Sequence, residues 1–427
     1  MANLNFSKRQ LIIVAAAVLL VAGFLYVIFA GGKEEGQYPP VSLAFWGTDK
    51  TENMELLIAS YKQLRPNVTI TYTEVAPEEY ESRLLEALAA GEGPDVFVIK
   101  NTGVSRQKSR LAAADLTQAN ADTLKIFPTV VAQDALRDGE VYFLPLYMDT
   151  LTLFYNRDLL DQAAIAQPPQ TWDEFQKDVV KLRSVTPAGQ ILRAGAAIGG
   201  TKQTVHAASD LLAVLMFQNG ATVWDEQNQT FKFASENNFG MQALDFYLQF
   251  VNPLSGYYTW SESQPNDLQA FAEGKAAMIF AYRSELADLK AKTPFLNFGV
   301  APLPQVPGTE RIANYASYEG LAVSKQSQAA GWAWDFALYT TTNNEIMKPY
   351  LDAAGKLPAL KTALSSYPEN SADGIFAKAA FTARSFFMPD DLKVKEILND
   401  TIKNVIMGKF DAARSLRQAE EQMNQFR

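Results

Sequence analysis

The chain has 427 residues, 48% hydrophobic and 20% charged, so it can build two or three domains and is neither disordered nor collagen-like. Its formal net charge of −9 argues against a nucleic-acid partner, because such binding depends on neutralising phosphates. It contains no cysteine and one histidine, His206. These counts exclude zinc ribbons, thiol nucleophiles and multi-histidine metal sites; no cofactor is expected, and His206 is interpreted as a surface or pocket-wall residue.

An uninterrupted apolar run, LIIVAAAVLLVAGFLYVIFA, occupies residues 11–30. At about 1.5 Å per residue it would reach about 30 Å, the thickness of the hydrocarbon core of a bilayer. Basic residues precede the run, so the positive-inside rule predicts a cytoplasmic stub over residues 1–10 and an ectodomain on the extracellular or periplasmic side. The run is longer than a usual signal-peptide core, so we predict an uncleaved single-pass anchor in the cell membrane, with cleavage near Ala30 as the alternative. Residues 31–40 are interpreted as a linker.

The next 60 residues alternate between strand and helix patterns. In order, the patterns predict a strand over 41–47, a helix over 51–64, a strand over 67–75, a helix over 77–91 and a strand over 93–99. This alternation predicts a parallel or mixed α/β sheet with right-handed crossovers.

Similar patterns continue to the C-terminus. They predict an extended segment over 141–160, a helix that begins after a capping box of Thr171 and Glu174, a helix–turn–strand unit over 268–282, short strands at 297–304 and 319–325, a helix over 331–341, and helices from 392 to 427. Trp332 and Trp334 of this helix are two positions apart and point in different directions, so they are not expected to stack on a sugar, and Trp334 is interpreted as a core residue.

Several fragments, taken in order, resemble the extracellular solute-binding proteins of ABC importers, specifically their maltose-binding-protein-like sugar-binding group. They are Trp46 at the end of the first strand, AAGEGPDVFVI, LPLYMDTLTLFYNRDLL, PPQTWDEF, FAEGKAAM, GVAPLPQ, GLAVSK with the following AWDF helix, and GKLPA. The resemblance spans residues 41–427 and departs only at the N-terminus, where many relatives carry a cleaved signal or a lipidated cysteine.

The resemblance implies a two-lobed α/β fold with discontinuous lobes and a ligand cleft. The first lobe would comprise 41–146 plus 316–364, and the second 147–315 plus 365–427. It also implies a monomeric, non-enzymatic protein that captures a mono- or oligosaccharide by hinge closure and delivers it to ABC permease subunits in the membrane.

Sugar sites need aromatic planes for the ring faces and polar groups for the hydroxyls. Ligands of open α/β sheets bind beyond the carboxyl ends of the strands, which points to the residues that follow the first and third strands. Together, these positions and the resemblance predict a ligand site of Trp46, Thr48, Asp49, Asn101, Thr102, Tyr147, Asp149, Gln203, Thr204, Tyr282, Arg283, Tyr318, Phe386 and Phe387.

Other functions remain open from the sequence. The same fold could bind a peptide, a polyamine or a phosphorylated polyol, or act as the sensory ectodomain of a signalling complex. A hydrolase is the least favoured, because the sequence contains no nucleophile elbow, P-loop or metal motif.

Overall fold

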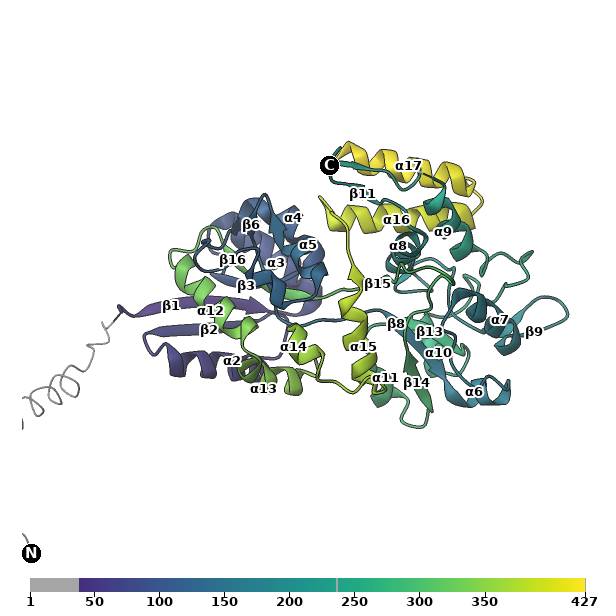
Figure 1. Ribbon diagram of the computed structural model, residues 1–427, viewed down its shortest axis with the longest axis horizontal. Helices are drawn as coiled ribbons and strands as arrows, with labels where there is room; N and C mark the ends of the chain where they lie inside the picture. The colour runs from purple at the N-terminus through teal and green to yellow at the C-terminus, as the bar shows by residue number, and fades with distance from the viewer. Residues whose placement is uncertain (1–37, 236, 427) are drawn as a thin grey trace, which may run out of the picture.

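The computed structural model describes residues 38–235 and 237–426. Two lobes lie side by side, and the chain passes between them several times (Figure 1). This is the two-lobed α/β architecture that the sequence predicts. The predicted anchor, linker start and cytoplasmic stub lie outside the described residues. Within the described part of the chain, no helix has the length and apolar character needed to span a bilayer.

The first lobe is built around a six-stranded sheet with the order β2-β1-β3-β16-β4, in which β7 also pairs with β16. Its elements, with η for a 3₁₀ turn, are β1 (Val41–Gly47), α2 (Thr51–Leu64), β2 (Val68–Glu74), α3 (Pro77–Ala90), β3 (Val96–Lys100), η1 (Asn101–Gly103), α4 (Val104–Gln107), η2 (Lys108–Arg110), β4 (Leu111–Ala112), η3 (Thr123–Ile126), α5 (Thr129–Ala135), β5 (Leu136–Arg137), β6 (Glu140–Val141), β7 (Leu144–Pro145), β16 (Glu319–Ser324), α12 (Ala330–Thr342), α13 (Asn344–Ala354) and α14 (Lys361–Leu364).

The predicted β-α-β-α-β order is confirmed, and the sheet is mixed. Strand β1 is parallel to β2 and β3, whereas β16 runs antiparallel to β3. The core beside β1 is aromatic: Phe45, Tyr61 and Phe336 are fully buried and meet edge to face. Trp334 of α12 is also buried, as predicted, and helix α3 ends at Gly91, whose positive φ of 79° suits glycine.

The second lobe surrounds a three-stranded antiparallel sheet with the order β13-β8-β14. Its elements are β8 (Thr152–Asn156), α6 (Arg157–Gln162), α7 (Trp172–Leu182), β9 (Ser184–Val185), β10 (Ile191–Arg193), α8 (Ala208–Asn219), β11 (Trp224–Asp225), β12 (Thr230–Phe231), α9 (Phe239–Leu248), α10 (Asp267–Ala272), β13 (Met278–Ala281), α11 (Ser284–Lys292), β14 (Phe298–Ala301), β15 (Asn314–Tyr315), α15 (Ala372–Phe381), β17 (Ala383–Arg384), α16 (Asp391–Ile406) and α17 (Ala412–Gln425).

The predicted capping box at the start of α7 is confirmed. The Thr171 hydroxyl accepts a hydrogen bond from the Glu174 N–H, and the Glu174 carboxylate accepts one from the Thr171 N–H. The next residue, Trp172, is buried and donates to the Gln218 side chain at 2.6 Å. The cap therefore begins a helix whose first residue is already part of the core of the second lobe.

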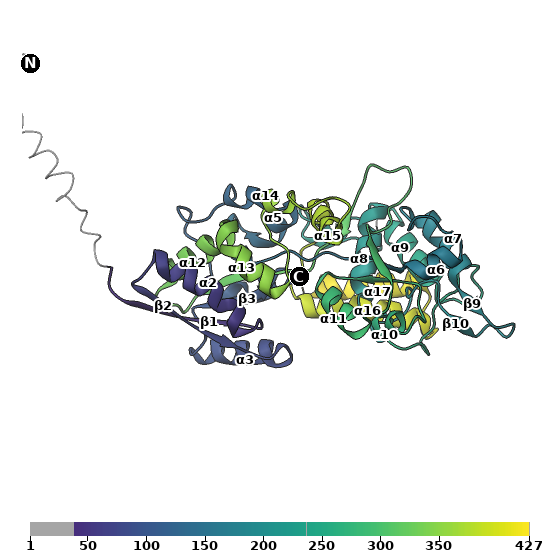
Figure 2. The ribbon, with the colours of Figure 1, turned by 90° about the horizontal axis from the view of Figure 1, so that it is seen from below.

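The chain crosses between the lobes from β7 to β8, from β15 to β16 and from α14 to α15. Figures 1 and 2, which are views at right angles, both place α15 at the junction. Its Phe376 packs into the core of the second lobe, whereas Ala377 and Ala380 pack into the core of the first. Helix α15 thus belongs to both lobes, whereas the sequence assigns residues 365–427 to the second lobe alone.

Candidate functional site

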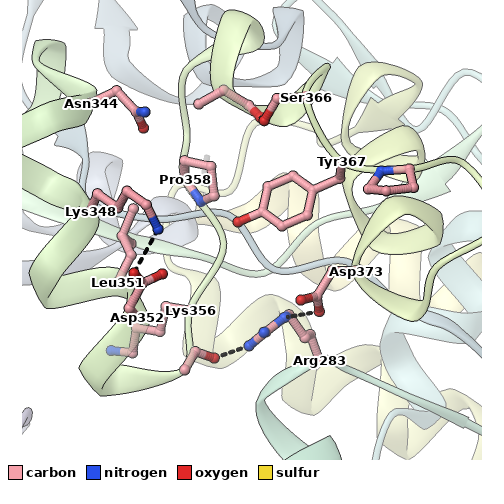
Figure 3. A pocket seen from close by; sticks show the side chains of 13 residues that line it. Arg283, Asn344, Lys348, Leu351, Asp352, Lys356, Pro358, Ser366, Tyr367 and Asp373 are labelled. Atoms are coloured by element: carbon pink, nitrogen blue, oxygen red, sulfur yellow. Dashed lines mark hydrogen bonds and ion pairs between the residues drawn. The ribbon is translucent and has the colours of Figure 1, made fainter.

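Three cavities lie along the boundary between the lobes, and residues of both lobes line each of them. The cleft cavity, of about 230 Å³, lies between α3 and the start of α16. The hinge cavity, of about 410 Å³, lies between α13 and α15 (Figure 3). The aromatic groove, of about 290 Å³, lies between α5 and β11.

The cleft cavity occupies the place where an α/β sheet usually binds its ligand. Thr48 follows β1 and Thr102 follows β3, so both stand at the carboxyl ends of parallel strands. The first lobe lines the cavity with Thr48, Pro77, Tyr80, Glu81, Leu84, Val98, Ile99, Lys100, Thr102, Gly103, Arg106, Gln107 and Glu319, and the second lobe with Asp391, Leu392 and Lys395.

The lining mixes apolar and polar groups. Tyr80 contributes an aromatic ring, and its hydroxyl donates to the main-chain oxygen of Val98 at 2.8 Å. Burial raises the pKa of Tyr80 well above its usual value, so the hydroxyl stays protonated. The exposed ammonium group of Lys100 and the hydroxyl of Thr48 add hydrogen-bonding groups. Such a wall suits a solute with apolar faces and many hydroxyls.

An ion pair closes the cleft cavity from one lobe to the other. Nε of Arg106 donates to Oδ1 of Asp391 at 2.7 Å, and the Thr102 hydroxyl donates to Oδ2 of Asp391 at 3.0 Å. On the other side, the Arg106 guanidinium pairs with Glu81 of α3. The two lobes are therefore in contact across the cleft.

A polar network lies between the cleft cavity and the hinge cavity. Lys356 pairs with the Asp49 carboxylate at 2.6 Å, and its ammonium lies 4.1 Å from the centre of the Tyr147 ring. Tyr350 also donates to Asp49 at 2.7 Å, while the Tyr147 hydroxyl donates to Glu319 at 3.0 Å. The side chains of Asp49 and Tyr147, two predicted site residues, therefore have bonding partners in the first lobe.

Two further predicted residues, Asp149 and Arg283, lie at the hinge. The Asp149 carboxylate accepts the main-chain N–H groups of Arg283 and Ser284, at the start of α11. Arg283 itself donates to Asp373 at 2.8 Å and to the main-chain oxygen of Gly355, as Figure 3 shows.

Basic side chains that line the hinge cavity are paired with acidic ones. Lys348 pairs with Asp352 at 2.6 Å, as Arg283 does with Asp373. The Tyr367 ring points into the same space from the opposite wall (Figure 3). The cleft cavity is the better candidate for a ligand site, because it lies at the carboxyl ends of β1 and β3.

The predicted pair Phe386 and Phe387 lines the aromatic groove and lies outside the lining of the cleft cavity. The Phe387 ring is 4.7 Å from the ring of Trp224, and the Arg137 guanidinium lies 5.6 Å above Phe387. Sequence reasoning did not select Trp224 or Arg137, because the two-residue strands that carry them, β11 and β5, show no distinctive pattern.

The other predicted residues also lie outside the lining of the cleft cavity. Asn101 and Tyr318 are buried and donate to Asp134 at 2.9 and 2.6 Å. Thr204 bonds to Glu262, and Tyr282 bonds to Asp210. Gln203 is exposed on a loop, and the Trp46 ring lies beneath Arg83 of α3, 5.9 Å from its guanidinium. Of the predicted set, the structure brings Thr48 and Thr102 together in the cleft cavity.

Sequence reasoning missed the side chains of α3, β3, α4 and α16 that complete this cavity. They are Tyr80, Glu81, Lys100, Arg106, Asp391 and Lys395. A usable signal existed for Lys100 alone, which directly precedes the polar pair chosen after the third strand. The others lie on helices or turns whose facing partners are distant in the sequence.

The single histidine, His206, is a structural residue of the second lobe. Its Nδ1 lies 2.8 Å from Asp267, and its Nε2 lies 3.3 Å from Glu285. Burial by itself lowers the pKa of His206, but the two carboxylates outweigh that effect and raise it to about 10. Among the described residues, no group of three or more histidine, aspartate or glutamate side chains could hold a metal ion.

Comparison with known proteins identifies a family. A sequence profile of the family described as bacterial extracellular solute-binding protein matches residues 47–344. The maltotriose-binding protein of Pyrococcus abyssi is 22% identical over 79% of this chain and 70% of its own length. The maltodextrin-binding protein MdxE of Bacillus subtilis is 28% identical over 61% of this chain and 63% of its own length.

Solved structures share the fold. The sugar-binding protein MalE of Xanthomonas citri superposes with a TM-score of 0.75 at 20% identity, over 90% of this chain and 97% of that one. A cyclo/maltodextrin-binding protein in complex with maltotetraose superposes with a TM-score of 0.74 at 20% identity, over 92% of this chain and 98% of that one.

Proposed function

Because this chain belongs to the family of bacterial extracellular solute-binding proteins, we propose that it captures a carbohydrate between its lobes and delivers it to an ABC permease. The observation that carries the proposal is the cleft cavity, which both lobes line at the carboxyl ends of β1 and β3. Relatives named for maltotriose and maltodextrin, and a similar structure with maltotetraose bound, support an oligosaccharide as the solute.

In this mechanism the protein binds and releases a solute without changing it. With the lobes apart, a sugar contacts the first lobe at Thr48, Lys100 and the Tyr80 ring. When the lobes close, Lys395 of the second lobe reaches the same cavity, and Asp391 pairs with Arg106 in its lining. The solute favours closure because the full set of contacts exists only in the closed state. The closed form is then the one that a permease would recognise.

Within this proposal the predicted site residues have two roles. Thr48 and Thr102 contact the solute. Asp49, Tyr147, Asp149 and Arg283 hold the crossing segments, and the remaining predicted residues support the lobes. We also propose the lobe boundaries stated above, 41–146 plus 316–364 and 147–315 plus 365–427, with the qualification that α15 packs on both cores.

We propose that residues 11–30 tether the monomeric ectodomain to the cell membrane, with residues 31–40 as the linker. A tether raises the local concentration of the binding protein near its permease. Fractionation of cells that produce the full chain tests this proposal. We expect the protein in the membrane pellet at high salt and in the detergent phase; release by salt alone would contradict an anchor.

A thermal-shift screen of the full chain in detergent tests the solute class. A ligand that binds only the folded state raises the melting temperature according to RT ln(1 + [L]/Kd). We expect a rise with an oligosaccharide such as maltotriose, and none with peptides or polyamines. Lys100→Ala, in the cleft cavity, should reduce the rise, whereas Lys290→Ala, on the exposed side of α11, should leave it unchanged. A response only to a polyamine or a peptide would overturn the carbohydrate assignment.

A further inference from the structure

Asp391 is a residue of the second lobe that contacts the cleft face of the first lobe. It is the first residue of α16, and its side chain is only 5% exposed. Both of its carboxylate oxygens are used, one by Arg106 at 2.7 Å and the other by Thr102 at 3.0 Å. Both donors come from the first lobe, from the segment that directly follows β3.

The partner of Asp391 is held in position by its own lobe. The Arg106 side chain is 17% exposed and lies between two carboxylates, Glu81 of the same lobe and Asp391 of the other. Burial by itself lowers the pKa of Arg106, but the hydrogen bond to Asp391 and the nearby Glu81 raise it above its usual value. The guanidinium therefore stays charged, and Glu81 orients it toward the second lobe.

Separation of the lobes would break this pair. With the lobes together, Asp391 is paired and almost buried; with the lobes apart, both charges return to water. If one partner is removed by mutation, the other charge loses this partner and is still buried whenever the lobes close, which makes the closed state unfavourable. The pair therefore favours contact between the lobes only while both partners are present.

We infer that Asp391 is a positioning residue for solute capture, because its ion pair with Arg106 holds the lobes together across the cleft whether or not a solute is bound. Part of the free energy of closure then comes from the protein itself, and the solute supplies the rest. The effect on solute release rests on the proposed function, whereas the effect on the solute-free protein does not.

The distance between the lobes in the solute-free protein tests the inference directly. The chain has no cysteine, so Glu86→Cys on α3 and Glu396→Cys on α16, both at exposed positions, allow a spin label on each lobe of the full chain in detergent. Asp391→Asn removes the charge at the contact. The matched control is Asp400→Asn, which removes the same charge from an exposed position of the same helix.

We expect Asp391→Asn to shift the distribution of label distances to longer values by several ångström, and Asp400→Asn to leave it unchanged. In the labelled protein that retains Asp391, salt at 1 M should move the label distances toward those of Asp391→Asn, because salt screens the attraction between the two charges. If Asp391→Asn fails to fold, Arg106→Gln makes the same test from the other side of the pair. Coincidence of the variant and control distributions would overturn the inference.

Release of a solute gives a second readout. With maltotriose as the probe, Asp391→Asn should increase the dissociation rate at least threefold, because release requires the lobes to part, while Asp400→Asn should not. An unchanged rate together with an unchanged label distance would refute the role of Asp391. If maltotriose does not bind at all, the proposed solute is wrong, and the label distances still decide the inference.

Discussion

The Asp149 carboxylate accepts the main-chain N–H of Arg283 at 2.7 Å, which joins the first crossing segment to the start of α11. Asp149 also links the first crossing segment to the second, because its main-chain oxygen accepts the N–H of Ser317 at 3.0 Å. Arg283 extends the connection to Gly355, ahead of the third crossing. Asp149 and Arg283 together therefore connect the segments that cross between the lobes.

This position makes the stability of the hinge depend on pH. Burial raises the pKa of Asp149 to about 7, although the hydrogen bonds from Ser284 and Arg283 favour the ionised form; nearby Glu285 adds to the rise. The folded state therefore holds the proton more tightly than the unfolded state. The stability that this group contributes is present below its ordinary pKa of 3.8 and is lost as pH rises through 7.

We expect the free energy of unfolding to fall by up to roughly 4 kcal/mol from this group between pH 4 and pH 8. Asp149→Asn, which keeps an oxygen for the cap but cannot ionise, should flatten that slope. Urea unfolding across this pH range measures both, and Asp161→Asn, at an exposed position of α6, is the control. If the free energy of unfolding has the same dependence on pH in the protein and in Asp149→Asn, the raised pKa of Asp149 is contradicted.

His206 should remain charged throughout the physiological pH range. Its pKa is raised to about 10, so its contribution to stability is fully present below the ordinary value of 6.5 and is lost as pH rises through 10. Because the chain has one histidine, the resonance of its Hε1 proton can be assigned without ambiguity. We expect no titration of that signal between pH 5.5 and 8.5, and titration near 6.5 in the urea-unfolded chain. A midpoint near 6.5 in the folded protein would refute the double pairing with Asp267 and Glu285.

Tyr318 should matter for stability and not for solute contact. Its hydroxyl donates to the buried Asp134 at 2.6 Å, and Asp134 also accepts from Asn101 and from Ser385 of the second lobe. Tyr318→Phe removes one of the three hydrogen bonds to this buried carboxylate, which should cost about 1–3 kcal/mol of unfolding free energy. The control is Tyr339→Phe, because Tyr339 is a half-buried tyrosine on α12 of the same lobe. A loss of solute affinity without a loss of stability would return Tyr318 to the binding site.

Trp46 and Thr48 are two residues apart but should respond differently to mutation. The Trp46 ring lies beneath Arg83, whereas Thr48 lines the cleft cavity. We expect Trp46→Ala to leave solute affinity within twofold, and Thr48→Ala to weaken it by about 0.5–1.5 kcal/mol, which is the usual worth of one hydrogen bond. Calorimetry with the solute found by the screen measures both. The reverse order of effects would place the sugar against Trp46, as the sequence alone suggested.

Local patterns were sufficient to predict most elements of the fold. The alternation of strand and helix over residues 41–99 depends on side-chain period and on turn residues, which act within a few positions along the chain. The capping box of Thr171 and Glu174 is equally local, and the structure confirms it. The order of these elements also carried the family resemblance, which the match over residues 47–344 confirms.

The lining of the cleft cavity depended on the tertiary structure. Thr102 and Asp391 are 289 positions apart and meet only because two lobes with separate cores are brought together. The sequence could place polar residues at strand ends, but it could not tell which would find partners within their own lobe, as Asn101 and Tyr318 do with Asp134. A buried polar group bonds to whatever donor or acceptor packing brings near, and that choice is made by contacts between distant segments and not by local pattern.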